Sequence, residues 1–296
     1  MEFGIIPPVR TGATADPDWM TTFARHVESR GFESLVMVEH AVVISDYTST
    51  YPYAASGRMP LPDDCRIPDP LDLMAFLAAV TDRITLATGV LVVPNHQAVV
   101  LAKRIATVDV LSKGRVRMCL GVGWMEEELR ATGADPRTRG RRLDETILAM
   151  RALWADSGPS GASFHGEFVS FDHAHSYPKP VRAGGVPLHI GGHSEAAARR
   201  ACRLGDGFQP LGLSAEDLAL RVAQMREAAE AAGRDPDAVE LSVSGYLPTT
   251  TEEEVAAADA AGVVRMLLST SMSDDLDGLA GEVDVFATRF GLSSAS

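Results

Sequence analysis

Short strand-like segments alternate with helix-like segments along this whole chain, and no other feature constrains its fold as strongly. The strand-like segments are apolar runs rich in Val, Ile and Leu, which is typical of parallel strands buried on both faces. They span residues 3–7, 34–38, 84–90, 115–120, 187–190, 207–210, 240–247 and 263–269. Eight such units in 296 residues predict an α/β fold, a single (β/α)8 TIM barrel over residues 1–296, because one barrel takes about 250 residues.

Capping residues and helical spacing mark the segments between the strands. Asp16-Pro17 and Asp69-Pro70 each place an N-cap aspartate before a proline, which favours the first turn of a helix. Apolar residues then recur three or four positions apart, as they do on the buried face of a helix. The further helices are expected around residues 98–111, 143–154, 194–204, 218–233 and 275–290.

Two stretches interrupt the alternation. Residues 41–68 follow the second strand and are rich in Pro, Tyr, Ser and Asp, which makes them too long for an ordinary connection. Because long loops in a compact barrel often bind ligands, we expect a lid there. A small hairpin insertion is expected after residue 160, turning around Gly166.

Charge and cysteine content narrow the partners and the location. The net charge of −13 argues against nucleic acid or an anionic membrane as the main partner. The three cysteines, Cys65, Cys119 and Cys202, lack metal-like spacing and suit a reducing compartment. The N-terminus does not resemble a signal peptide, and no apolar run approaches the roughly 20 residues of a membrane helix. A cytoplasmic protein is expected.

His40 closes the run 34–40, just after the second predicted strand, and is the strongest candidate for chemistry. In a TIM barrel the C-terminal ends of the strands form the active site. A polar side chain there costs desolvation free energy unless a partner uses it. The alternative is a structural histidine that bonds to a neighbouring carbonyl.

Two glycine turns follow other strands. Gly121-Val122-Gly123 precedes one helix, and Gly191-Gly192-His193 precedes another. Glycine lets a ligand approach the backbone, and a helix N-terminus favours phosphate. Ligand-free turns explain either motif alone, and neither matches a dinucleotide or P-loop fingerprint. His173 and His175 lack partners at metal-ligand spacing, so no metal is expected. The residues alone indicate a barrel enzyme that binds a phosphate-bearing ligand near His40.

Ten segments carry a family resemblance, in order: residues 31–35, 39–40, 69–71, 84–90, 102–103, 106–115, 121–124, 178–180, 191–192 and 205–208. Together they resemble the luciferase-like flavin and deazaflavin oxidoreductases. The Gly-Val-Gly-Trp form of residues 121–124 is most similar to the branch that uses coenzyme F420. The resemblance fades beyond Gly233.

The resemblance implies roles for individual residues. Gly89 and Val90 match a bulge where relatives hold a cis peptide bond against the cofactor ring. His40 matches the histidine beside the reactive carbon of the ring, where it stabilises charge or passes a proton. Glu126 falls where some deazaflavin relatives place an active-site acid. Glu39, a predicted cofactor-binding residue, stands where relatives usually have Asp.

The two glycine turns are implied to line the cofactor and to hold its phosphate. The stretch 93–97 lacks the basic residue that is common there in relatives. The residues expected to bind the cofactor in these turns are Gly121, Val122, Gly123, Trp124, Gly191, Gly192 and His193.

Three functions remain open. The leading hypothesis is hydride transfer between coenzyme F420 and a small organic substrate. The second is a monooxygenase that uses O2 and reduced FMN supplied by a separate reductase. The third is a barrel that binds a phosphorylated ligand without redox chemistry, or a metal-free lyase. The resemblance also implies a homodimer.

Overall fold

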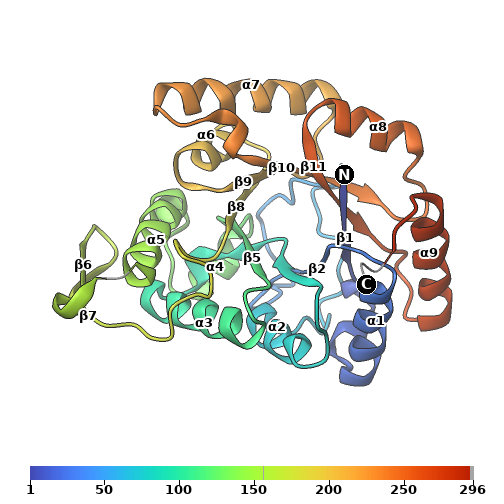
Figure 1. Cartoon of the computed structure of the whole chain (residues 1–296), viewed down its shortest axis with the longest axis horizontal. Coiled ribbons are helices and arrows are strands. Elements are labelled where there is room, and N and C mark those ends of the chain that lie inside the picture. The colour runs from blue at the N-terminus through green and yellow to red at the C-terminus, as the bar shows by residue number, and fades with distance from the viewer. Residues whose placement is uncertain (156, 294–296) are drawn as a thin grey trace.

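The computed structural model describes residues 1–155 and 157–293 as a closed parallel barrel surrounded by helices (Figure 1). The chain enters the barrel at β1, and β11 pairs with β1 to close it. β3 also pairs with β5, and this seam completes the ring of strands. The strands are β1 (Glu2–Ile6), β2 (Ser34–Met37), β3 (Thr85–Thr88) with its continuation β4 (Leu91–Val92), β5 (Val116–Gly121), β8 (Leu188–Gly191), β9 (Gly207–Gln209), β10 (Glu240–Tyr246) and β11 (Val263–Ser269). The predicted TIM barrel is confirmed.

The helices form the outer layer (Figure 1). Asp16 and Asp69 cap the first two as expected, since each carboxylate accepts two backbone N–H groups of the first turn. The helices are α1 (Pro17–Ser29), α2 (Pro70–Ala78), α3 (Ala98–Leu111), α4 (Glu126–Ala131), α5 (Arg139–Trp154), α6 (Glu195–Leu204), α7 (Ala215–Ala231), α8 (Glu252–Ala260) and α9 (Leu276–Arg289). Within residues 1–155 and 157–293, no helix combines the length and the apolar character needed to cross a bilayer.

Helix α8 is absent from the sequence-based prediction. It has no fully buried residue, so no apolar stripe marks it. The signal that could have found it is a capping box, in which Thr251 accepts the N–H of Glu254 and the Glu254 carboxylate accepts the N–H of Thr251.

Side chains alternate between the lumen of the barrel and the layer under the helices, as the pleat of each strand requires. On β2 and β11, Leu35 and Leu268 pack under the helices. Their neighbours Val36 and Leu267 form a small separate apolar cluster with Ala87. By this alternation the cluster lies on the lumen side of the strands.

Charged side chains close the N-terminal end of the lumen. Arg117 donates to both oxygens of Glu33, and Arg265 donates to Glu33, Glu2 and Glu240. Burial raises the pKa of Glu33, but the two guanidinium groups outweigh it and bring that pKa to about 2. Nearby His189 is buried beside the same arginines, and its pKa falls to about 3.

Two excursions leave the barrel. The lid loop, residues 41–68, follows β2, and its Tyr47 and Met59 are buried against Met125. The predicted hairpin is present as β6 (Ala162–His165) and β7 (Ser170–Ala174), and it projects from the barrel beside α5 (Figure 1). The Glu145 carboxylate on α5 accepts three successive N–H groups of the hairpin turn.

Replacing Glu33 by Gln is expected to lower the free energy of unfolding by about 3 kcal/mol at pH 7. The pKa of Glu33 falls from 4.5 to about 2 in the folded chain, so folding stabilises the ionised form. This stabilisation is therefore present above pH 4.5 and is lost as the pH falls toward 2. Urea denaturation of both proteins across this range measures it. The exposed substitution Glu227→Gln serves as the control, and a wild-type-to-Gln difference that is independent of pH would contradict the assignment.

Candidate functional site

Three strand ends meet around the side chain of Val90. A Cβ added to Gly121 would lie 2.6 Å from Val90 Cγ2, and a Cβ added to Gly191 would meet Val90 Cγ1. These predicted site residues are thus brought together. Because neither glycine has a side chain, the Val90 side chain fits between them. The sequence did not reveal this reason for their presence.

The backbone at Val90 forms a shelf at the mouth of the barrel. The Gly89–Val90 peptide bond is cis, as the resemblance implied. The Gly89 N–H donates to the Met37 carbonyl at 2.7 Å. The Thr88 hydroxyl bonds to both the N–H and the carbonyl of Cys119, at 2.9 and 2.8 Å, across the β3–β5 seam. We call residues 89–92 the shelf.

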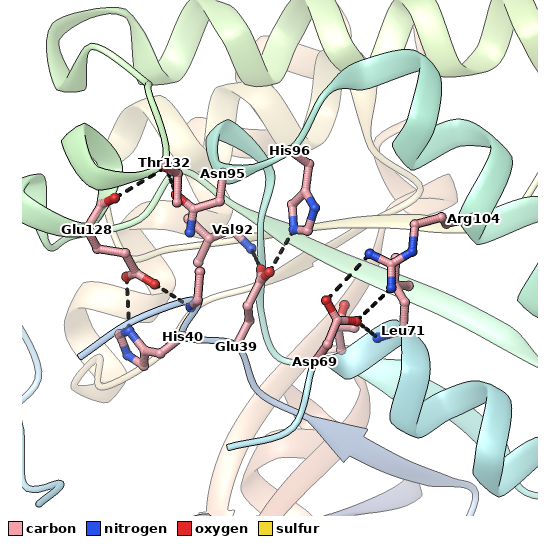
Figure 2. A network of polar contacts seen from close by, with 12 residues as sticks. Glu39, His40, Asp69, Leu71, Val92, Asn95, His96, Arg104, Glu128 and Thr132 are labelled. Carbon is pink, nitrogen blue, oxygen red and sulfur yellow. Dashed lines mark hydrogen bonds and ion pairs between the residues drawn. The ribbon is translucent and has the colours of Figure 1, made fainter. Parts of the chain in front are cut away.

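The Glu39 carboxylate stabilises the shelf and the segment after it through polar contacts. One carboxylate oxygen accepts the Val92 N–H, and the other lies 2.7 Å from His96 Nε2. Figure 2 shows the Glu39 side chain turned to these partners and away from His40. The carboxylate is buried, so the two contacts replace the water that it loses. Glu39 therefore supports the shelf.

His40 lies beside the shelf and pairs with Glu128 (Figure 2). Its Nδ1 is 3.0 Å from Glu128 Oε2. The side chains are 12% and 3% exposed. A buried carboxylate opposite Nδ1 keeps the proton on that nitrogen and leaves Nε2 as the second, free position of the ring.

Glu128 also holds the start of the lid loop. Its Oε1 accepts the N–H groups of Ala41 and Val42 at 2.6 and 3.4 Å. Thr132, one turn further along, donates to Asn95 Oδ1 at 2.8 Å and so ties α4 to the segment after the shelf (Figure 2). Glu128 is a site residue that the sequence-based prediction missed.

Glu126, the acid expected from the resemblance, points elsewhere. Its carboxylate pairs with Arg130 at 2.6 Å and is 44% exposed. Three consecutive glutamates begin α4, and successive helical residues point about 100° apart. The run of acids was thus a visible signal, but the sequence did not show which member faces His40.

Aromatic rings connect His40 to the second glycine turn. Trp124 packs edge-on against His40, Tyr47 and Tyr51, with ring centroids 6.2, 5.2 and 5.1 Å apart. Tyr51 contacts Tyr53 in turn. Burial raises the pKa of Tyr53 to about 12. The lid loop and Trp124 thus form one wall of the mouth.

The turn after β8 ends this wall at His193, whose ring lies 5.4 Å from that of Tyr53. Gly192 has φ +122°, a conformation open to glycine but rare for other residues. The Ser194 hydroxyl accepts the Ala197 N–H and caps α6. His193 Nδ1 is buried and has no hydrogen-bond partner, so this nitrogen remains available to a ligand.

His173 and His175, the two histidines considered as metal ligands, lie in β7 and just after it. His173 Nδ1 bonds to the Ser160 carbonyl at 3.0 Å. Among the described residues, no group of three or more His, Cys, Asp or Glu side chains is arranged to hold a metal ion.

Replacing Gly121 by Ala is expected to destabilise the barrel by about 1–3 kcal/mol, because the added methyl group crowds Val90. The double variant Gly121→Ala/Val90→Ala should recover much of this loss. Urea denaturation of wild type, Gly121→Ala, Val90→Ala and the double variant gives the coupling free energy between the two positions. Gly281→Ala is the control, since a Cβ there meets nothing within 4 Å. Additive effects of the two substitutions would argue against the crowding.

Known proteins share this architecture. Residues 1–289 match the family described as luciferase-like monooxygenase. An uncharacterized protein of Mycobacterium tuberculosis is 36% identical over 225 residues, which cover 74% of this chain and 77% of the relative. The FMNH(2)-dependent dimethylsulfone monooxygenase of Pseudomonas putida is 26% identical over 282 residues, covering 94% of this chain and 70% of that one.

A solved structure extends the likeness in fold. The F420-dependent secondary alcohol dehydrogenase, solved with an F420–acetone adduct, superposes with a TM-score of 0.76 at 18% identity and covers 97% of each chain. The barrel, the sequence relatives and the match over residues 1–289 agree, and the chain belongs to the luciferase-like monooxygenase family.

Proposed function

We propose that this chain transfers a hydride between coenzyme F420 and a small organic substrate at the C-terminal mouth of the barrel. The observation that carries the proposal is the buried pair of His40 and Glu128 beside the shelf. A histidine whose Nδ1 is held by a carboxylate presents Nε2 to a ligand and can take up or release a proton there. Such a group suits hydride transfer to or from carbon when a neighbouring oxygen changes its proton.

The residues at the mouth fit a cofactor of this kind. Gly121 and Gly191 add no side chains of their own beside Val90, so a flat ring can lie against the shelf. The unpartnered Nδ1 of His193 and the start of α6 suit the phosphate of the cofactor. F420, when bound, supplies a ring carbon that accepts or donates the hydride.

His40 and the wall of the mouth then do the protein's part of the work. For an alcohol substrate, the hydride leaves carbon and the hydroxyl proton passes to His40 Nε2; the reverse reaction returns both. Glu128 offsets the positive charge that the ring gains. Trp124 and the tyrosines of the lid loop exclude water from the reacting atoms.

Replacing His40 by Ala is expected to lower kcat by about 10²- to 10⁴-fold, because proton transfer loses its group. The affinity for F420 should change little, since the shelf and the glycine turns stay intact. Fluorescence titration gives the affinity, and steady-state kinetics give kcat. His165→Ala, in the exposed hairpin, is the control. Unchanged kcat in His40→Ala would contradict the assignment of proton transfer to His40.

A second candidate, favoured by the sulfone monooxygenase relative, is oxidation of an organic substrate by O2 and reduced FMN. A separate reductase would supply the reduced FMN. Parallel titration of the purified protein with F420 and FMN separates the two functions. Tight FMN binding without F420 binding, together with substrate-dependent oxygen consumption, would replace the first proposal with the second.

We also propose that the chain forms a homodimer through α2 and α3. Val100 and Leu111 on α3 are each 58% exposed, and Val99, Val110 and Phe76 add to the same pair of adjacent helices. Exposed apolar patches of this kind mark protein interfaces.

Introducing charge into this patch is expected to separate the subunits, because a desolvated carboxylate is costly in an apolar interface. The variant is Val100→Glu/Leu111→Glu, and sedimentation velocity reports the mass. Leu220→Glu, on exposed α7, is the control. A wild-type protein that sediments as a monomer would refute the dimer.

A further inference from the structure

The three glutamates that begin α4 have three separate sets of partners. Glu126 pairs with Arg130 on its own helix. Glu127 contacts Thr48 and Ser49 in the lid loop. Glu128 contacts His40 and the first two residues of that loop. One turn of helix therefore touches both the proposed reacting histidine and the lid.

Glu127 fastens the lid loop with both oxygens. Oε1 accepts the Thr48 N–H at 2.8 Å and the Thr48 hydroxyl at 2.9 Å, and Oε2 accepts the Ser49 hydroxyl at 2.7 Å. Burial raises the pKa of Glu127, but these hydrogen bonds outweigh it and lower it to about 2. The carboxylate is therefore ionised, and the fastening is at full strength, at neutral pH.

Ser49 in turn caps the start of helix α4. Its hydroxyl oxygen accepts the Glu126 N–H at 3.0 Å, whereas the N-cap residue Met125 makes no side-chain cap. Helix α4 has six residues, and isolated helices shorter than about 12–15 residues are at best marginally stable in water. Its first turn thus depends on the lid loop for capping.

We propose that Glu127 is a positioning residue for His40, acting through the lid loop and helix α4. Glu127 joins Thr48 and Ser49 to the first turn of α4. This contact holds Glu128 in the position where one carboxylate oxygen contacts His40 Nδ1 and the other accepts the N–H groups of Ala41 and Val42. When the lid loop separates from Glu127, the first turn of α4 loses its cap and Glu128 loses this alignment. Its importance for turnover rests on the proposed function of His40, but its effect on the ring does not.

The structure provides a matched series for the test: Glu126→Gln, Glu127→Gln and Glu128→Gln. Met125 and Leu129 anchor α4 in the protein interior, so the variants should fold. Long-range ¹H–¹⁵N NMR of cofactor-free protein labelled at histidine reports which nitrogen of His40 carries the proton, and His40→Asn identifies the signal. Hydrogen exchange of the Ala41 and Val42 amides reports their bonds to Glu128.

In wild type we expect the proton on Nδ1 and slow exchange at both amides. Glu127→Gln should give a mixture of both tautomers and exchange about tenfold faster, since losing a charge-assisted contact shifts local opening by about this factor. Ser49→Ala, which removes only the hydroxyl, should act in the same direction. Glu128→Gln sets the upper limit, and Glu126→Gln should match wild type.

In the loaded enzyme, Glu127→Gln should lower kcat about tenfold while the affinity for F420 stays unchanged. A wild-type tautomer and wild-type exchange in Glu127→Gln would overturn the proposal. An equal effect of Glu126→Gln would also overturn it, because any loss of helical charge would then suffice. The NMR result holds even if F420 proves not to be the cofactor, so failure of the two proposals can be distinguished.

Discussion

Closing eight parallel strands into a barrel leaves a lumen in which each side chain must match the size of those on neighbouring strands. At the mouth this constraint falls on Val90, which occupies the space that Gly121 and Gly191 leave open. The same pairing of one valine with two glycines leaves the ends of β5 and β8 without side chains at these positions. The shelf and the two glycine turns therefore meet at this one side chain.

The barrel was predictable because its signals are local. Each strand is a compact apolar run, and the bounds of α3 agree with the expected range 98–111. Two features escaped for physical reasons. The extension of the third strand as β4 escaped: the residues predicted a strand over 84–90, whereas β3 ends at Thr88 and pairing resumes at Leu91, after the Gly89–Val90 bulge that the resemblance implied. Helix α8 buries none of its side chains completely, so hydrophobic periodicity could not mark it.

The site was predictable only in part. His40 and the glycine turns follow from their places at strand ends, because a parallel barrel gathers all those ends on one face. Their partners do not follow, since contacts such as His40 with Glu128 join residues 88 positions apart. A run of three acids has no periodicity from which a direction can be read. The charged end of the lumen was not predictable either, because Glu33, Arg117 and Arg265 lie far apart in the sequence and meet only in the folded barrel.

The three glutamates of α4 have a consequence for how this family can change its chain length. A residue gained or lost between Trp124 and Glu126 would rotate the helix by about 100°. Each carboxylate would then face the partner of its neighbour, with the exposed acid turned toward the lid or the lid acid toward His40. Although this turn lies near the surface, where loops ordinarily tolerate insertions and deletions, its length should be as restricted as that of the barrel strands. Substitutions that keep the count are the changes open to it.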